Sequence, residues 1–376
     1  MMKITDIEIF HVKVPVKKIA DGGIAPYRGH DLPKGEGLCY AFRSIIKVTT
    51  EDGIIGWGET SPVISPKVQR TILDTYIKPL LLGKDCYALN KVIADETKLH
   101  EPPVYIRGLF CGIDIACWDI RGKAADVPVY KLLGGKIRDR VGIAYCFGLE
   151  DIDLTIEKTG QIREDGYSCL KTTGGENFHF DIERAYQLRK AAGNELDIRI
   201  DINEAFDYRD ATTFLHAVEC LELEYVEQPI RVNQIQALKI FRQRSQTPIA
   251  INEDCYIPHN LFEYVKEDAI DVAVVDLDPI GGITGIVQYA DFSEEAGLPL
   301  VHHCGFDLGI KLAAILQVAA ARIAFSRAID STYMTHEDDI LQEKIQIENG
   351  KYIVPDKPGL GIDVDMEKIE YYTIDE

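Results

Sequence analysis

Hydrophobic and polar residues alternate in two stretches near the start of the chain. KITDIEIFHVKVPV at residues 3–16 and RSIIKVTTEDGIIGWGE at residues 43–59 have the period of two that is typical of β-strands. An Asp-Gly pair divides the second stretch, which predicts a hairpin after an edge strand. Helical patterns follow from about residue 67 to residue 133, where the glycines of LLGG end the last helix.

The segment 20–37 lies between these strands and contains many polar residues and glycines. It is too long for an ordinary connection, and segments of this kind often act as lids over a binding site. Its Tyr27, Arg28 and His30 are candidate contacts to a charged or hydroxyl-rich substrate.

From residue 141 onward the pattern changes to short apolar runs that recur every 24 to 30 residues, with helical patterns between them. Regular alternation of strand and helix predicts parallel strands joined by crossover helices, and seven or eight such units predict a closed barrel. The runs are VGIAYCFG (141–148), YSCLKTT (167–173), DIRIDIN (197–203), LEYVEQP (223–229), PIAINED (248–254), VAVVDLD (272–278), LPLVHHC (298–304) and RAIDSTY (327–333).

The expected fold class is therefore α/β: a (β/α)7-8 TIM-type barrel with an N-terminal α+β capping domain. We place the capping domain at residues 1–132 and the barrel at residues 133–345. Residues 346–376 read as a hairpin and a tail, and we expect this segment to return to the capping domain.

Composition narrows the functional classes. A formal charge of −20 argues against nucleic-acid binding, which needs a basic surface, and 46% hydrophobic residues support a sizeable core. No stretch is apolar and long enough to span a bilayer. The nine cysteines are scattered and never spaced C-x-x-C, which favours free thiols in a reducing compartment; a cytoplasmic location is expected.

Most of the barrel runs end on a polar residue, and barrel active sites are built at the carboxyl ends of the strands. Asp201, Glu227 and Glu253 end three successive runs, each 26 residues after the last. Several carboxylates on one rim are costly without a cation, and an all-oxygen set favours a hard ion, Mg²⁺ before Mn²⁺. The alternative is that each acid caps the next helix or pairs with a surface lysine.

Asp276 and His303 end two later runs and form a candidate pair in which the carboxylate orients a basic imidazole. His302 competes with His303, although strand alternation points the two side chains in opposite directions. Lys171 ends the second run and is either a cation directed into the site or a side chain that extends to solvent. A metal, a lysine and a His–Asp pair together suit removal of a proton next to a carboxylate, because they stabilise the resulting ene-diolate.

These residues resemble one known group of enzymes. The order Lys171, Asp201-x-Asn203, Glu227-Gln-Pro, Asn252-Glu253, Asp276 followed by Gly-Gly, then His303, is similar to the mandelate racemase/muconate lactonizing enzyme family of the enolase superfamily. GWGE, GIDIACWDIRGKA, LLGG and PGLGI extend the resemblance over nearly the whole chain.

The resemblance implies roles for individual residues. Asp201, Glu227 and Glu253 would bind Mg²⁺, and His303 with Asp276 would be the base of the mandelate racemase-like branch. Lys171 would neutralise the substrate carboxylate. Thr173, Asn203 and Asp330 would lie near the substrate, and the segment 20–37 and the turn after Glu59 would be mobile loops that select it. The family often forms symmetric assemblies, so a homo-oligomer that takes a small carboxylate substrate is expected.

One departure from the family pattern bears on the reaction. Racemases of this type carry Lys-x-Lys at the end of the second strand, whereas this chain has Lys171-Thr172-Thr173. A threonine hydroxyl is a poor base near neutral pH, and racemisation normally needs a base on each face. Dehydration needs only one, so the sequence favours β-elimination of water from a sugar acid or related hydroxy-acid. A racemase, epimerase or cycloisomerase that uses Lys171 and His303, and a barrel that binds metal without catalysis, are the alternatives.

Overall fold

The computed structural model describes residues 2–17, 40–61, 64–89, 91, 104–148, 152–175 and 177–374. The segment 20–37, with Tyr27, Arg28 and His30, lies outside the described residues, as do residues 62 and 63 of the turn after Glu59. No helix in the described part of the chain is long and apolar enough to cross a membrane.

An antiparallel sheet in the order β1-β2-β3 forms one side of the N-terminal part. Its strands are β1 (Ile4–Pro15), β2 (Tyr40–Thr50) and β3 (Ile55–Thr60), with Gly53 at a positive φ of 77° in the predicted Asp-Gly turn. The helical segments that follow are α1 (Pro66–Ile72), the π-helix η1 (Leu73–Ile77), α2 (Lys78–Leu81), the 3₁₀-helix η2 (Cys86–Ala88), α4 (Val104–Ala124) and α5 (Val129–Leu132).

Two glycines allow α4 to pack closely on β3. A Cβ on Gly58 would lie 1.7 Å from the carbonyl oxygen of Gly112, and one on Gly56 would lie 2.1 Å from that of Ala116. The GWGE motif is therefore a packing requirement of the capping domain, where a side chain would force the helix away from the sheet.

In the described part of the chain, eight parallel strands form the barrel, as the apolar runs predict. Consecutive strands pair from β4 to β10, and β11 pairs with β4, so the ring has β10 and β11 as neighbours at its seam. The strands are β4 (Arg140–Phe147), β5 (Cys169–Thr173), β6 (Asp197–Asp201), β7 (Tyr225–Glu227), β8 (Ile249–Ile251), β9 (Val272–Val275), β10 (Leu300–His302) and β11 (Ile329–Ser331).

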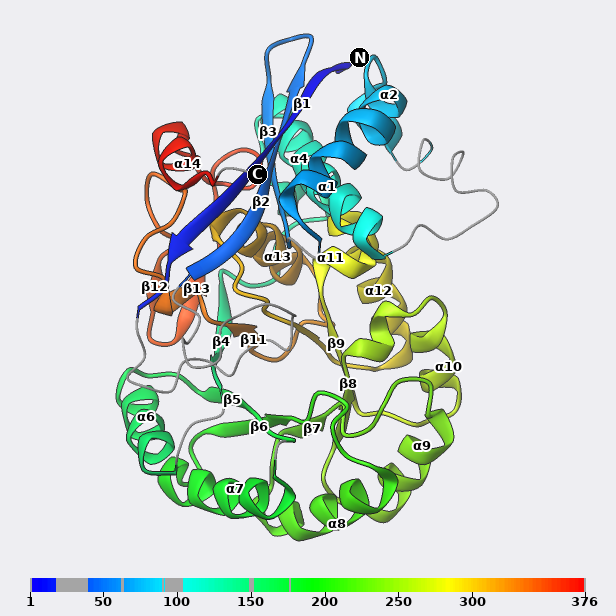
Figure 1. Ribbon diagram of the computed structural model, residues 1–376, viewed down its shortest axis with the longest axis vertical. Helices are drawn as coiled ribbons and strands as arrows, with labels where there is room; N and C mark the ends of the chain where they lie inside the picture. Colours follow the sequence, from blue (N-terminus) through cyan, green and yellow to red (C-terminus); the bar gives the residue numbers. More distant parts are fainter. Residues whose placement is uncertain are drawn as a thin grey trace.

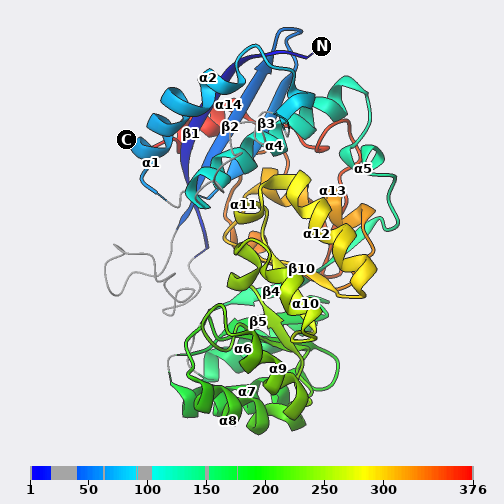
Figure 2. The same cartoon turned by 90° about the vertical axis from the view of Figure 1, so that its right-hand side faces the viewer.

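Helices lie outside this ring and cover it. They are α6 (Ile152–Glu164), α7 (Phe178–Ala192), α8 (Tyr208–Val218), α9 (Ile235–Arg244), α10 (Asn260–Lys266), α12 (Gly282–Ala296) and α13 (Gly309–Ala321), with the short segments η3 (Glu219–Leu221), η4 (Glu253–Tyr256), α11 (Leu277–Ile280) and η5 (Tyr333–Thr335). The capping sheet with α1, α2 and α4 lies at one end of the molecule, and α7 and α8 lie at the opposite end (Figure 1, Figure 2).

The C-terminal segment divides between the two parts. The hairpin β12 (Ile347–Glu348) and β13 (Lys351–Ile353) pairs antiparallel with barrel strand β4. The helix α14 (Met366–Tyr372) then leads to Ile374, whose backbone N–H donates to the carbonyl of His11 on β1 at 2.9 Å. Gly359 also pairs with Pro128, and α14 contacts β1, so the segment after the hairpin reaches the capping domain.

Candidate active site

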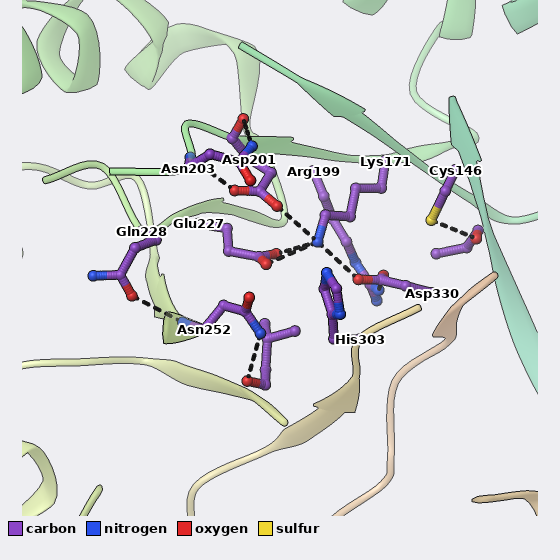
Figure 3. A network of polar contacts seen from close by, with 12 residues as sticks. Cys146, Lys171, Arg199, Asp201, Asn203, Glu227, Gln228, Asn252, His303 and Asp330 are labelled. Carbon is purple, nitrogen blue, oxygen red and sulfur yellow. Dashed lines mark hydrogen bonds and ion pairs between the residues drawn. The ribbon is translucent and has the colours of Figure 1, made fainter. Parts of the chain in front are cut away.

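Lys171 is the centre of a buried group of charges at the strand ends (Figure 3). Its Nζ lies 3.2 Å from Asp201 Oδ2, 2.7 Å from Glu227 Oε2 and 2.9 Å from Asp330 Oδ2. The residue is only 6% exposed, so the alternative in which Lys171 extends to solvent is wrong. Burial lowers the pKa of Lys171, but Asp330, Glu227 and Asp201 outweigh it and hold that pKa well above the usual value.

Asp330 binds a cation on each carboxylate oxygen. Oδ2 accepts from Lys171, and Oδ1 accepts from Arg199 Nη1 at 2.7 Å. Arg199 has no exposed surface, and its Nε donates to Glu224 at 2.6 Å below the site. Arg199 is not among the site residues predicted from the sequence. Its position two residues before Asp201 was an available signal, because alternate residues of a strand face the same side.

The three candidate metal ligands lie at the ends of adjacent strands. Asp201 and Glu227 are register partners on β6 and β7, and Glu253 begins η4, one residue (Asn252) after the end of β8. Burial, with a smaller contribution from Asp201, raises the pKa of Glu253 to about 8, and the pKa of Glu227 is raised for the same two reasons. Oε2 of Glu253 is buried and has no hydrogen-bond partner among the described residues.

These carboxylates fit a hard divalent cation by their chemistry. They are all-oxygen donors, they are buried at a cost that a cation would offset, and Glu253 has an oxygen to offer. The described side chains do not form a close cluster of three His, Cys, Asp or Glu around one point. In this conformation the ammonium of Lys171 lies between Asp201 and Glu227.

The backbone after these strands adopts conformations that ordinary residues rarely adopt. Asn203, Glu204 and Gln228 have positive φ angles of 49°, 63° and 37°. Asn203 donates its backbone N–H to Asp201 Oδ1 at 3.0 Å, so this contact orients a candidate ligand. Gln228 accepts from the backbone N–H of Asn252 at 3.0 Å, which ties β7 to β8. Such local strain is often found at functional sites.

His303 and Asp276 are in contact on the other side of the site. His303 Nδ1 lies 3.3 Å from Asp276 Oδ2, and the imidazole lies beside Asp330 and Lys171 (Figure 3). His302 is instead buried at 1% exposure, and burial lowers its pKa to about 4. Of the two histidines, His303 is therefore the one that faces the group of charges. Asp276 also binds Lys311 Nζ at 2.6 Å, a contact that the sequence analysis missed.

Thr173 lies at the end of β5 as the register partner of Asp201. Its Oγ1 is buried and has no hydrogen-bond partner in the described part of the chain. Its carbonyl oxygen accepts from Arg184 on α7. The structure thus places a small hydroxyl, and no second ammonium, two residues after Lys171.

Comparison with known proteins gives this arrangement a family. Residues 155–368 match the family described as "Enolase C-terminal domain-like", and residues 41–134 match "Mandelate racemase / muconate lactonizing enzyme, N-terminal domain". Arabinonate dehydratase of Saccharolobus solfataricus is 28% identical over 84% of this chain and 86% of its own length. Muconate cycloisomerase 1 of Acinetobacter baylyi is 29% identical over 87% of this chain and 90% of its own.

Solved structures agree with this relationship. The 3,6-anhydro-D-galactonate cycloisomerase from Zobellia galactanivorans superposes with a TM-score of 0.84 at 26% identity, over 99% of this chain and 100% of that one. The N-succinyl Arg/Lys racemase from Bacillus cereus has the same fold, with a TM-score of 0.89 at 23% identity over 100% of this chain and 99% of that one. The predicted fold and family are confirmed: this chain belongs to the mandelate racemase/muconate lactonizing enzyme family of the enolase superfamily.

Proposed function

We propose that this enzyme is a Mg²⁺-dependent lyase that removes the proton α to a carboxylate and eliminates the β-hydroxyl as water. The substrate class is a sugar acid or a related hydroxy-acid. The observation that carries the proposal is the end of β5, where Thr173 stands in place of a second lysine and Lys171 is bound by three carboxylates. His303 is then the only side chain proposed as a base.

Each side chain has one task in this reaction. His303 takes the α-proton while Asp276 holds its imidazole, and Lys171 offers its ammonium to the substrate carboxylate. The C–O bond at the β-carbon breaks, a Cα–Cβ double bond forms, and the hydroxide leaves as water with the proton that His303 carried. When bound at Asp201, Glu227 and Glu253, Mg²⁺ supplies positive charge that stabilises the anion formed by proton loss.

A second candidate function is an isomerase. Muconate cycloisomerase and an N-succinyl-L-Arg/Lys racemase are about as similar to this chain as the dehydratase is. A racemase needs a base on each face, so Lys171 would have to give up a proton although three carboxylates surround it. A cycloisomerase that opens a ring needs only one base, which removes the α-proton. The ring oxygen then leaves the β-carbon but remains attached to the substrate through its other bond.

The test is a screen of sugar acids, arabinonate included, followed by ¹H NMR in D₂O with Mg²⁺ present. We expect a 2-keto-3-deoxy acid from at least one substrate, and the H303N variant should lose the activity by at least about 10²-fold. Exchange of the α-proton without loss of water would contradict the lyase assignment. Exchange that survives H303N and disappears in K171A would instead identify Lys171 as an independent base.

A further inference from the structure

Lys311 is a fully buried lysine in the apolar helix α13, and nothing in the reaction above uses it. The helix reads GIKLAAILQVAAA, and Lys311 has no exposed surface. Its Nζ lies 2.6 Å from Asp276, 2.9 Å from Asp278 and 3.0 Å from Asp307. A charge in such a place is costly unless it is paired, so these carboxylates are what keep the ammonium in the core.

The partner at the shortest distance is the carboxylate that also contacts His303. Asp276 Oδ1 binds Lys311, while Asp276 Oδ2 contacts His303 Nδ1 at 3.3 Å. Asp276 Oδ1 also accepts from the backbone N–H of Asp278 at 3.0 Å. A carboxylate held on one oxygen by a buried ammonium and a backbone amide cannot rotate freely, so its other oxygen presents a fixed acceptor to the imidazole.

We propose that Lys311 is a positioning residue, which fixes Asp276 and so sets the orientation and proton affinity of His303. The inference rests on the proposed function, since that function makes His303 the base. Lys311 limits how strongly Asp276 attracts a proton to the imidazole, because the ammonium already neutralises part of the carboxylate charge.

The other carboxylates connect Lys311 to the capping domain. Asp278 Oδ2 accepts from Lys311 and from the hydroxyl of Ser61, the latter at 2.7 Å, directly after β3. Asp307 Oδ1 contacts Arg43 on β2 at 3.3 Å. The capping sheet and the His303–Asp276 pair are thus joined through one ammonium.

Charged groups face His303 from several elements, and a change in its proton affinity must be judged against all of them. They are Asp276 after β9, His302 on β10, Asp330 on β11, Lys171 on β5 and, through Asp276, Lys311 on α13. Of these, Lys311 can be neutralised without changing a group proposed to touch the substrate.

The test is an NMR titration of His303 in the Mg²⁺-loaded enzyme labelled with ¹³C at the histidine Cε1 position. The signal of His303 is assigned by its loss in H303N. In K311M we expect the midpoint of His303 to rise by about one pH unit, because Asp276 then acts on the imidazole with its full charge. K311R keeps the positive charge, so the midpoint of His303 in that variant should stay close to the parent value.

K123M is the matched control, since Lys123 forms a 2.7 Å ion pair with Asp119 on α4 away from the histidine. The titration midpoint of His303 in K123M should agree with that in the parent protein. K311M removes the ammonium that pairs with three buried carboxylates, a change that destabilises the folded protein. The double variant K311M/D278N keeps the formal charge of the cluster unchanged and is measured if the single variant does not fold. In the double variant we expect the midpoint of His303 to rise by about half a pH unit. The rise persists because Asp276 still loses its ammonium, whereas the neutralised Asp278 faces Ser61 and does not contact the imidazole.

A midpoint of His303 unchanged within about 0.2 unit in a folded K311M or K311M/D278N protein would overturn the inference. The titration needs no substrate. Failure of the sugar-acid screen would therefore leave this result interpretable, and an unchanged midpoint would not by itself contradict the lyase assignment.

Discussion

At the scale of single residues, Asp330 should contribute to stability, because it is the shared partner of two buried cations. Lys171 and Arg199 are 6% and 0% exposed, and each binds one of its oxygens. D330N should lower the free energy of unfolding by about 1.5–3 kcal/mol, because each cation loses one charged acceptor while Lys171 keeps Asp201 and Glu227 and Arg199 keeps Glu224. Urea denaturation of the metal-free protein measures this.

D291N provides the comparison for that experiment. Asp291 also pairs with an arginine, Arg322, at 2.7 Å, but its side chain is 58% exposed. Solvent screens such a pair, so we expect a loss below about 1 kcal/mol. Equal losses in the two variants would show that Asp330 is not a buried anchor.

The same residues show how far a single sequence can predict a site. Strand-end positions led to Asp201, Glu227 and His303, because parallel strands bring their carboxyl ends to one rim. The contact of Lys171 with Asp330 joins residues 159 positions apart and could not be read from spacing. Lys311 was missed for another reason: in an apolar helix its role depends on Asp276, Asp278 and Asp307, which reach it only in the folded barrel.

At the scale of elements, the loop between β5 and α7 lies tightly against the loop after β6. Gly175 has a φ of +98°, and a Cβ there would lie 2.5 Å from the Cβ of Ala205 and 2.8 Å from the carbonyl of Ile202. G175A should therefore cost about 2–4 kcal/mol of unfolding free energy, from backbone strain and overpacking together. It should also weaken Mg²⁺ binding measured by calorimetry, because Asn203, which orients Asp201, lies in the displaced segment.

Gly193, at the opposite end of α7, offers a control. It follows α7 with a φ of +63°, and no atom lies within 4 Å of the position that a Cβ would take. G193A should cost about 1–3 kcal/mol, the backbone strain without the clash, and should leave Mg²⁺ affinity at the parent value. A G175A protein with the stability and Mg²⁺ affinity of G193A would refute the packing argument.

Element prediction from the sequence succeeded where the pattern was regular. All eight apolar runs contain a barrel strand, because each run is long enough to be buried on both faces and is separated from the next by a helix. The C-terminal segment was expected to return to the capping domain, and its later part does contact that domain: Gly359 pairs with Pro128, α14 contacts β1, and Ile374 donates to His11. Not foreseen was that its hairpin first pairs with β4 through β13. A short hairpin carries no sequence signal for which open strand edge it joins.

At the scale of the whole molecule, the capping domain and the barrel share one core, and a histidine is buried where they meet. Val12 and Val14 of β1 belong to the same hydrophobic cluster as Ile143 and Ile329 of the barrel. His336 forms a bridge with Val16, is 1% exposed, and has no hydrogen bond to either ring nitrogen among the described residues. Burial, with a smaller effect from Arg43, lowers its pKa to about 3.

Acid should therefore loosen this junction. In the unfolded chain a histidine takes up a proton below about pH 6.5, whereas folded His336 resists it down to about pH 3, so protonation favours unfolding. The contribution of neutral His336 is complete above pH 6.5 and is lost as the pH falls, by up to about 4 kcal/mol near pH 3. H336F, which keeps an apolar ring against Tyr333, should show a shallower loss in urea denaturation between pH 6.5 and pH 4.

The comparison is made at each pH against the parent protein and against H216Q, which replaces a histidine whose side chain is 83% exposed. The difference between H336F and the parent is expected to grow steadily as the pH falls, because each pH unit below 6.5 removes up to about 1.4 kcal/mol from the free energy of unfolding of the parent. H216Q should follow the parent curve throughout. Parallel curves for H336F and the parent would mean that His336 gains a proton in the folded protein as easily as in the unfolded one, and that the junction is open to water.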